Sequence, residues 1–169
     1  MSAVRILPGG RERAWHEAYH CAGLCIAGLV PKSARTDFPH DGAAGSVDID
    51  WGEGGHRNPA AAKAVLVAIV LGGTTEGHRG WEWDNWPIDA GQMAEGAVGD
   101  ALMVRELFDH FEMDRVDWAH VLWQAEQLGR RQDFRRLVVR IAAELEQIEV
   151  LHADDLRALM EPDREAMAA

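Results

Sequence analysis

The residues best suited to metal binding and catalysis lie in one short stretch, Trp15-His16-Glu17-Ala18-Tyr19-His20-Cys21. Histidines four residues apart lie one above the other on a helix, so both imidazoles can bind the same Zn²⁺. The glutamate of this HExxH pattern can then reach a water molecule on the metal and act on it as a base. The alternative interpretation is a buried helix in which the two histidines are incidental.

A catalytic zinc site usually has three protein ligands and one position open for water. The longer HExxHxxGxxH pattern is incomplete in this sequence, because Gly23 is in place but Ile26 stands where the third histidine belongs. Asp100 is the candidate for the missing ligand. A helix expected over roughly residues 91–112 places Asp100 in the centre of an apolar stripe formed by Met93, Ala97, Val104, Leu107 and Phe111.

A carboxylate on the apolar side of a helix is costly to bury unless a cation pairs with it. Three small residues beside Asp100 are expected to let this helix come close to the helix of the histidines: Gly96, Ala97 and Gly99. Asp100 therefore needs a cation, and the histidine pair needs a third ligand. Three other acidic residues of the same helix fall on its opposite, solvated face: Glu95, Glu106 and Asp109.

The helix that must position the histidines is expected to run from about Arg11 to Val30 and to end before Pro31. His16 and His20 share a face with Gly23 and Ala27, and these small residues would let another helix approach closely. Cys21 and Cys25 lie on the opposite face with Ala18 and Leu29. We expect both cysteines to be small core residues rather than metal ligands or a redox pair.

Two short strands are expected over residues 33–39 and 45–51, with His40-Asp41-Gly42 as the turn between them. His40 and Asp41 are therefore expected to be loop residues rather than catalysts. In the second strand, apolar residues alternate with Asp48 and Asp50, which predicts one buried and one solvated face.

Asn58 followed by Pro59 predicts the start of an apolar core helix that reaches Leu71 and is ended by Gly72-Gly73. Residues 81–87 contain three of the seven tryptophans, and we expect a loop pinned to the core by these rings; the alternative is the wall of a substrate cleft. The apolar spacing of the remainder predicts further helices: Trp118–Leu128, Leu137–Ile148, and Asp155–Met160, the last capped by Asp154 and stopped by Pro162. His110, His120 and His152 are expected to be surface or packing residues.

The composition indicates one globular domain. The 169 residues are 47% apolar and 27% charged, and the net charge of −11 disfavours nucleic acid or an anionic membrane surface as a partner. Two cysteines are too few for a disulfide scaffold. The apolar run 60–71 is too short to cross a bilayer, and residues 1–10 lack the core of a signal peptide. These features predict a cytoplasmic protein.

The motif residues resemble a known family when taken in order. The segment His16–Ala22 resembles the HEAGHA helix of peptidase family M41, the protease domain of FtsH-type ATP-dependent metalloproteases. Residues 44–47 resemble the glycine-led strand of that family, and residues 67–76 resemble its helix ending in GGRAAE. Gly96-Ala97-Val98-Gly99-Asp100 is similar to the GAxND segment, whose Asp is the third zinc ligand. Order and approximate spacing agree across residues 11–112.

The resemblance implies a mainly α (α+β) fold: a helical zincin-like metalloprotease domain with a small β-sheet and a C-terminal helical lobe. It implies zinc bound by His16, His20 and Asp100, with Glu17 as the catalytic base. A peptide or unfolded-protein substrate would lie along the edge of strand 45–51. The expected division of the single domain 1–169 is a zinc-binding catalytic part, 11–112, and a helical lobe, 113–169.

The sequence also departs from the family pattern. Tyr19 replaces a glycine, which is expected to place a bulky ring near the metal face, and Gly99 replaces an asparagine. The tryptophan-rich loop has no counterpart in the pattern, and no AAA ATPase module or membrane anchor is recognised. We therefore expect a metallopeptidase that cuts flexible peptides or loops, with a binding or regulatory module that kept the zinc as the alternative. Tyr19 and the missing ATPase favour the alternative, whereas Glu17 favours the enzyme.

Overall fold

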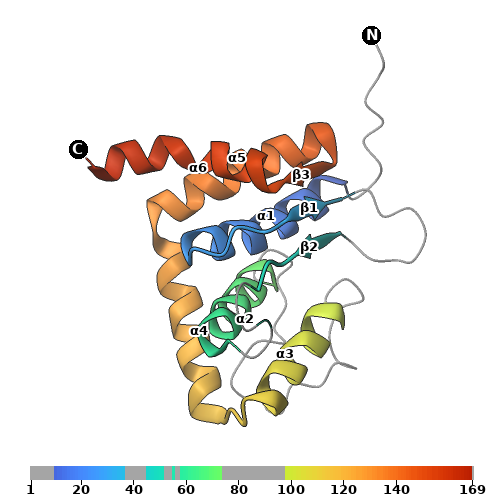
Figure 1. Cartoon of the computed structure of the whole chain (residues 1–169), viewed down its shortest axis with the longest axis vertical. Helices are drawn as coiled ribbons and strands as arrows, with labels where there is room; N and C mark the ends of the chain where they lie inside the picture. The colour runs from blue at the N-terminus through green and yellow to red at the C-terminus, as the bar shows by residue number, and fades with distance from the viewer. Residues whose placement is uncertain (1–9, 37–44, 52–54, 56–57, 74–97, 169) are drawn as a thin grey trace.

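The computed structural model describes residues 10–36, 45–51, 55, 58–73 and 98–168, which form a mostly helical structure with one small sheet (Figure 1). This confirms the predicted class, mainly α with a small β-sheet. Within these ranges no helix has both the length and the apolar character needed to cross a membrane. The elements in chain order are α1 (Gly10–Ile26), β1 (Ser33–Arg35), β2 (Ser46–Asp48), α2 (Pro59–Gly73), α3 (Val98–His110), α4 (Arg115–Arg130), α5 (Gln132–Ile148), β3 (Val150–His152) and α6 (Ala153–Ala168).

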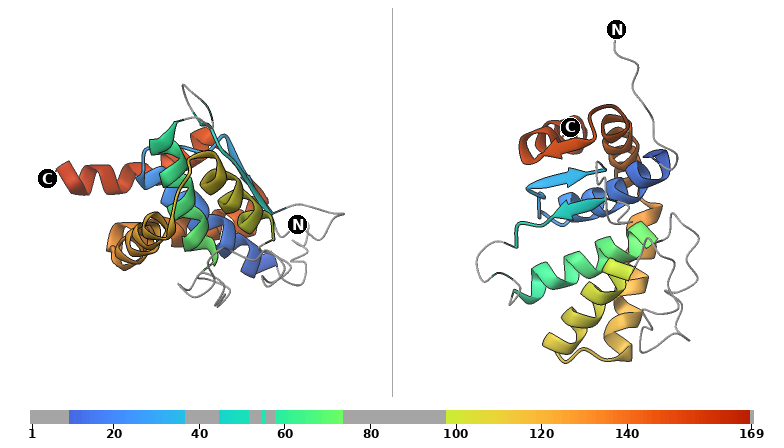
Figure 2. Two further views of the ribbon diagram at one scale, coloured as in Figure 1. Left: turned by 90° about the horizontal axis from the view of Figure 1, so that it is seen from below. Right: turned by 90° about the vertical axis from the view of Figure 1, so that its right-hand side faces the viewer.

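Helix α1, which contains the histidine pair, is enclosed by other elements. It packs on α5 and on α2, and Figures 1 and 2 show it between these two helices. The predicted close approach of another helix is confirmed for α2: a Cβ atom added to Gly23 would lie 3.1 Å from the Cα of Ala68. Small residues on α1 therefore bring the backbone of α2 against the histidine face.

The end of α1 differs from the prediction. The helix stops at Ile26, and Gly28 adopts a left-handed backbone conformation with φ of 85°. The amide of Leu29 donates to the carbonyl of Leu24 at 2.9 Å, and the amide of Gly28 donates to that of Cys25 at 3.0 Å. This is the hydrogen-bond pattern of a Schellman motif. The expected end at Pro31 was wrong because Gly28 ends the helix first.

The sheet has the strand order β2-β1-β3, and both pairings are antiparallel. Ser33 of β1 lies opposite Asp48 on one side and opposite His152 on the other. The first two strands are shorter than predicted, and the predicted turn at residues 40–42 lies outside the described residues. The predicted alternation is confirmed, since Asp48 and Asp50 are exposed while Val47, Ile49 and Trp51 are partly buried.

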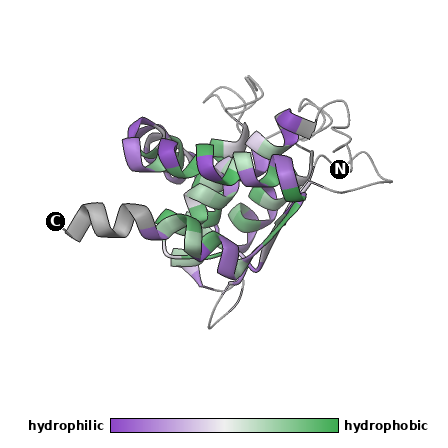
Figure 3. Ribbon diagram, turned by 90° about the horizontal axis from the view of Figure 1, so that it is seen from above, coloured by the Kyte–Doolittle hydropathy of each residue, from purple (hydrophilic) through white to green (hydrophobic). Residues whose placement is uncertain are grey.

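Helix α2 is the apolar core helix that the sequence predicts. The side chain of Asn58 caps it, because its Oδ1 accepts from the amides of Ala60 at 3.1 Å and Ala61 at 3.3 Å. Nearly every residue from Ala61 to Gly73 is buried. Figure 3 shows hydrophobic residues gathered where the helices face one another, with hydrophilic ones outside. The tryptophan-rich segment 81–87 lies outside the described residues, so its predicted role stays a prediction.

Helices α4 and α5 follow the predicted apolar repeats. A capping box starts α4: Asp114 accepts from the amide of Asp117, and Asp117 accepts from the amide of Asp114. Leu137, Ile141 and Leu145 form the buried stripe of α5. Ile148, expected in the same stripe, is the last residue of the helix and is 51% exposed, and Glu149 after it is left-handed.

Strand β3 and helix α6 depart from the prediction. Helix α6 begins at Ala153 and continues past Pro162, so the predicted stop at that proline is wrong. At the start of the helix the amide of His152 donates to the carboxylate of Asp155 at 2.9 Å, whereas Asp154 was expected to be the cap. Asp154 instead pairs with Arg157 one turn along the helix.

Candidate metal centre

Three side chains predicted to bind a metal meet at one point. His16 and His20 project from α1, and Asp100 projects from the first turn of α3. The Nε2 atoms of the two histidines are 2.8 Å apart. The Oδ2 atom of Asp100 lies 3.4 Å from Nε2 of His16 and 3.3 Å from Nε2 of His20. Among the described residues these three form a group able to hold a metal ion.

The separations suit a small tetrahedral ion. Bonds of about 2.0–2.1 Å to zinc with tetrahedral angles place neighbouring ligand atoms roughly 3.3 Å apart. Both contacts of Asp100 match this separation, and the histidine pair is slightly closer. A point about 2 Å from all three atoms exists for a triangle with these sides. The residues present therefore fit a metal ion with two nitrogen ligands and one oxygen ligand.

A backbone carbonyl sets the orientation of His20. Nδ1 of His20 lies 2.9 Å from the carbonyl oxygen of Ala68 on α2, and a carbonyl can only accept. Nδ1 is therefore the protonated nitrogen of the neutral ring, which leaves the lone pair on Nε2, the atom that faces Asp100. Histidine ligands of metals are commonly fixed by such a carbonyl contact. The two rings are edge to face, with centroids 4.4 Å apart.

Electrostatics at this point favour a positive charge. Burial lowers the pKa of His20, but the Asp100 carboxylate outweighs it, and with Glu17 and the Ala68 carbonyl it raises the pKa of His20 to about 9. Burial raises the pKa of Asp100, yet the two imidazoles hold it well below its usual range. The carboxylate is thus ionised at neutral pH and stabilises a cation, either a proton on His20 or a metal ion.

Two glycines that the sequence analysis did not single out as site residues line this centre. A Cβ atom on Gly72 would lie 2.1 Å from Cε1 of His20. A Cβ atom on Gly45 would lie 2.6 Å from Oε1 of Glu17 and 2.7 Å from the carbonyl oxygen of Arg35. No side chain fits at either position without displacing its neighbour. A signal existed for Gly72: a glycine inside an apolar helix often marks a close approach, but we expected it to end the helix.

Glu17 lies beside the histidine pair and is 3% exposed. Its carboxylate contributes to raising the pKa of His20, and it packs against the backbone at Gly45, immediately before β2. The glutamate of the motif is therefore buried between the three candidate ligands and the first residues of the outer strand.

The predicted buried and solvated faces of α3 agree with the structure. Val104 and Leu107 of the predicted stripe are buried, while Glu106 and Asp109 are exposed. Glu95 lies outside the described residues. Gly99 was expected to allow close helix approach, but in the described part of the chain a Cβ atom there would meet nothing within 4 Å.

Tyr19 does not lie where the family comparison predicts. Its ring packs edge to face on Phe134 of α5, with centroids 5.6 Å apart. Position 19 is one residue before His20 and so points about 100° away from it on the helix, toward α5 rather than the metal. Both cysteines are buried in the core, as expected. His110, His120 and His152 are exposed, and His40 and Asp41 lie outside the described residues.

Comparison of the chain with family models, with curated proteins and with solved structures found no match. The case for a metal centre therefore rests on the geometry and charge of these side chains.

Proposed function

We propose that this chain is a zinc-dependent metallopeptidase that cleaves flexible peptides or loops. The observation that carries the proposal is the convergence of His16, His20 and Asp100 at metal-ligand separations beside a buried glutamate. Two histidines and one carboxylate form the ligand set of a class of zinc hydrolases. The same set also suits ferrous iron, so Glu17 is the residue that favours hydrolysis.

The proposed chemistry divides between the metal and the protein. Bound zinc would supply Lewis acidity, which makes water nucleophilic at neutral pH and polarises a peptide carbonyl. Glu17 would accept a proton from the attacking water and then deliver it to the leaving amine. Asp100 would complete the ligand set with the two histidines, and the Ala68 carbonyl would keep the His20 imidazole oriented.

The position of Glu17 suggests where a substrate would lie. The carboxylate packs against the residue that leads into β2, and β2 is an outer strand of the sheet in the described part of the chain. An extended peptide could pair with that edge and present its backbone near Glu17. Flexible segments meet this requirement, because a folded domain does not expose an extended backbone. The proposed relationship to peptidase family M41 rests on the same residues as the proposed activity: His16, Glu17, His20 and Asp100.

The test is a pair of variants measured for metal and for cleavage. Purified protein should contain about one zinc per chain by elemental analysis and should degrade an unfolded substrate such as casein. Glu17→Gln should keep the zinc and the fold but lose cleavage by roughly a hundredfold or more, since it removes the general base. Glu106→Gln, an exposed glutamate on α3, serves as the matched control and should match wild type.

Three results would overturn the proposal. Iron in place of zinc would remove the basis for hydrolysis. Equal cleavage by wild type and Glu17→Gln would show that Glu17 is not the base or that the activity belongs to a contaminant. A zinc-loaded wild type without any cleavage would leave a binding module as the better description.

A further inference from the structure

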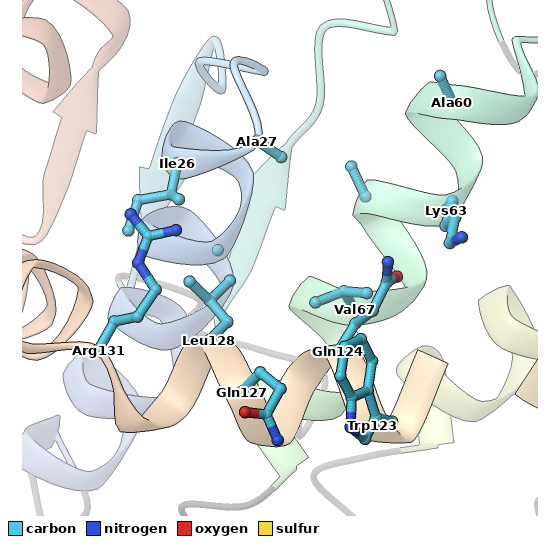
Figure 4. Close-up of a pocket in the computed structure, with 12 residues that line it drawn as sticks. Ile26, Ala27, Ala60, Lys63, Val67, Trp123, Gln124, Gln127, Leu128 and Arg131 are labelled. Carbon is cyan, nitrogen blue, oxygen red and sulfur yellow. The ribbon is translucent and has the colours of Figure 1, made fainter. Parts of the chain in front are cut away.

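A pocket of about 450 Å³ lies away from the metal centre, between the end of α1, the first half of α2, and α4 (Figure 4). Gly23 connects the two regions, since it lines the pocket and also contacts Ala68, whose carbonyl orients His20. The volume is in the range of small-molecule sites in proteins.

Small apolar residues give the pocket its shape. Helix α1 contributes Gly23, the turn after it contributes Ala27, and the facing helix α2 contributes Ala60 and Ala64. Side chains this short leave a furrow between two closely packed helices. The aliphatic side chains of Val67 and Leu128 complete its lining. A slender hydrocarbon chain fits such a furrow better than a bulky group does.

The charges around the pocket are opposite to those of the whole chain. The protein has 28 acidic and 17 basic residues, yet among the residues that the structure describes the pocket is lined by Lys63 and Arg131 and by no carboxylate. Arg131 already binds Asp133, with Nε 3.0 Å from Oδ1. Lys63 is exposed, and no described residue forms an ion pair with it. It is therefore the cation available to a ligand.

Further polar and aromatic groups lie near Lys63. Figure 4 shows Gln124 and Trp123 at the same end of the pocket as Lys63, with Arg131 at the other end beside Ile26. The Gln124 amide can donate to an anion, and Trp123, 56% exposed, offers an apolar ring at the rim. An apolar furrow with a few converging polar groups at one end is the usual form of a ligand site.

We propose that this pocket binds an amphipathic monocarboxylate of the medium-chain fatty-acid type. The hydrocarbon chain lies in the furrow between α1 and α2, and the carboxylate lies at Lys63 and Gln124. This site is independent of the proposed peptidase activity, since none of its residues is a candidate metal ligand or the general base.

The first test is calorimetric titration of the full chain with sodium decanoate below its micelle concentration. We expect saturable binding of one molecule per chain. Octanoate should bind about tenfold more weakly, because two fewer methylene groups are buried. Decanamide, which keeps the chain but lacks the charge, should bind about fivefold more weakly, the effect of an exposed ion pair.

The second test uses variants of the pocket. Lys63→Gln should weaken decanoate binding about fivefold, whereas Lys32→Gln, which changes the other lysine of the chain, should leave it unchanged. Ala64→Leu fills the furrow and should weaken binding at least about tenfold, with thermal unfolding as the check on the fold. Wild-type affinity for Ala64→Leu, equal effects of the two lysine variants, or no saturable decanoate binding would each overturn the proposal. So would a Lys63-dependent self-association that decanoate does not disrupt, because the occupant would then be a second copy of the chain.

Discussion

Helix α1 carries two pairs of reactive side chains with identical spacing, and their surroundings differ completely. His16 and His20 both face the carboxylate of Asp100, and His20 also contacts the carbonyl of Ala68. Cys21 and Cys25, also four residues apart, are 0% and 2% exposed within the apolar core. Burial raises the pKa of both thiols, to about 12 for Cys25. Spacing on a helix is therefore not sufficient for a metal site; polar partners from distant segments make the difference.

The largest expected effect comes from removing Asp100, the charged partner of the histidine pair. Asp100→Ala should lower zinc affinity by roughly a hundredfold or more, because it removes a ligand and the charge that stabilises a cation. Competition against a fluorescent chelator measures this affinity. Asp109→Ala, an exposed carboxylate on the same helix, is the matched control and should change little. Full zinc occupancy in Asp100→Ala, or in His16→Ala, would mean that the site is misassigned.

A smaller effect is expected from changing Gly72, which lies against the His20 ring. Gly72→Ala places a methyl group against the His20 ring, where a Cβ would lie 2.1 Å from Cε1. We expect zinc affinity to fall about ten- to a hundredfold, the usual effect of disturbing a residue that orients a metal ligand. The d–d absorption bands of bound Co²⁺ should change as well, since they report ligand geometry.

Two glycine controls separate orientation of the ligand from general stability. A Cβ on Gly23 meets first Ala68 and Leu71 of α2, whereas a Cβ on Gly72 meets the His20 ring. Gly23→Ala should therefore lower the unfolding temperature, with a smaller loss of zinc affinity than in Gly72→Ala. No described residue lies within 4 Å of a Cβ on Gly99, so Gly99→Ala should leave zinc affinity unchanged. Equal loss of zinc affinity in Gly72→Ala and Gly23→Ala would show that Gly72 acts only through packing.

Features of the fold that depend on local sequence were predicted well. The apolar spacing located α2, α4 and α5, and Asn58 located the start of α2, because caps and buried stripes depend on residues within a few positions. Strand β3 was missed, since three residues carry no usable alternation and the strand exists through pairing with β1. The end of α1 was misplaced because glycine and proline both end helices and Gly28 comes first.

The candidate site was predictable as far as it depends on side chains. The spacing of His16 and His20 and the apolar surroundings of Asp100 both leave a pattern in the sequence. The carbonyl of Ala68 leaves none, because every residue has one. Tyr19 was predicted to lie near the metal because it lies inside the motif in the sequence. Its direction on the helix instead places its ring against Phe134.

The smallest expected effect concerns the buried cysteine pair and the change of protein stability with pH. In the unfolded chain the thiol of Cys25 releases its proton near pH 9, whereas in the folded chain its pKa is about 12. Above pH 9 the folded state therefore holds more protons than the unfolded state, and the free energy of unfolding falls as pH rises. By pH 10 the free energy of unfolding of the wild type should fall by roughly 1 kcal/mol more than that of Cys25→Ala, measured by urea unfolding at pH 7, 9 and 10.

Zinc affinity should be the same in both proteins at pH 7, because Cys25 lies on the face opposite the histidines. Parallel stability profiles together with rapid alkylation of the native thiol would show that Cys25 is not held in the core, and loss of zinc from folded Cys25→Ala would remove the distinction between the two pairs.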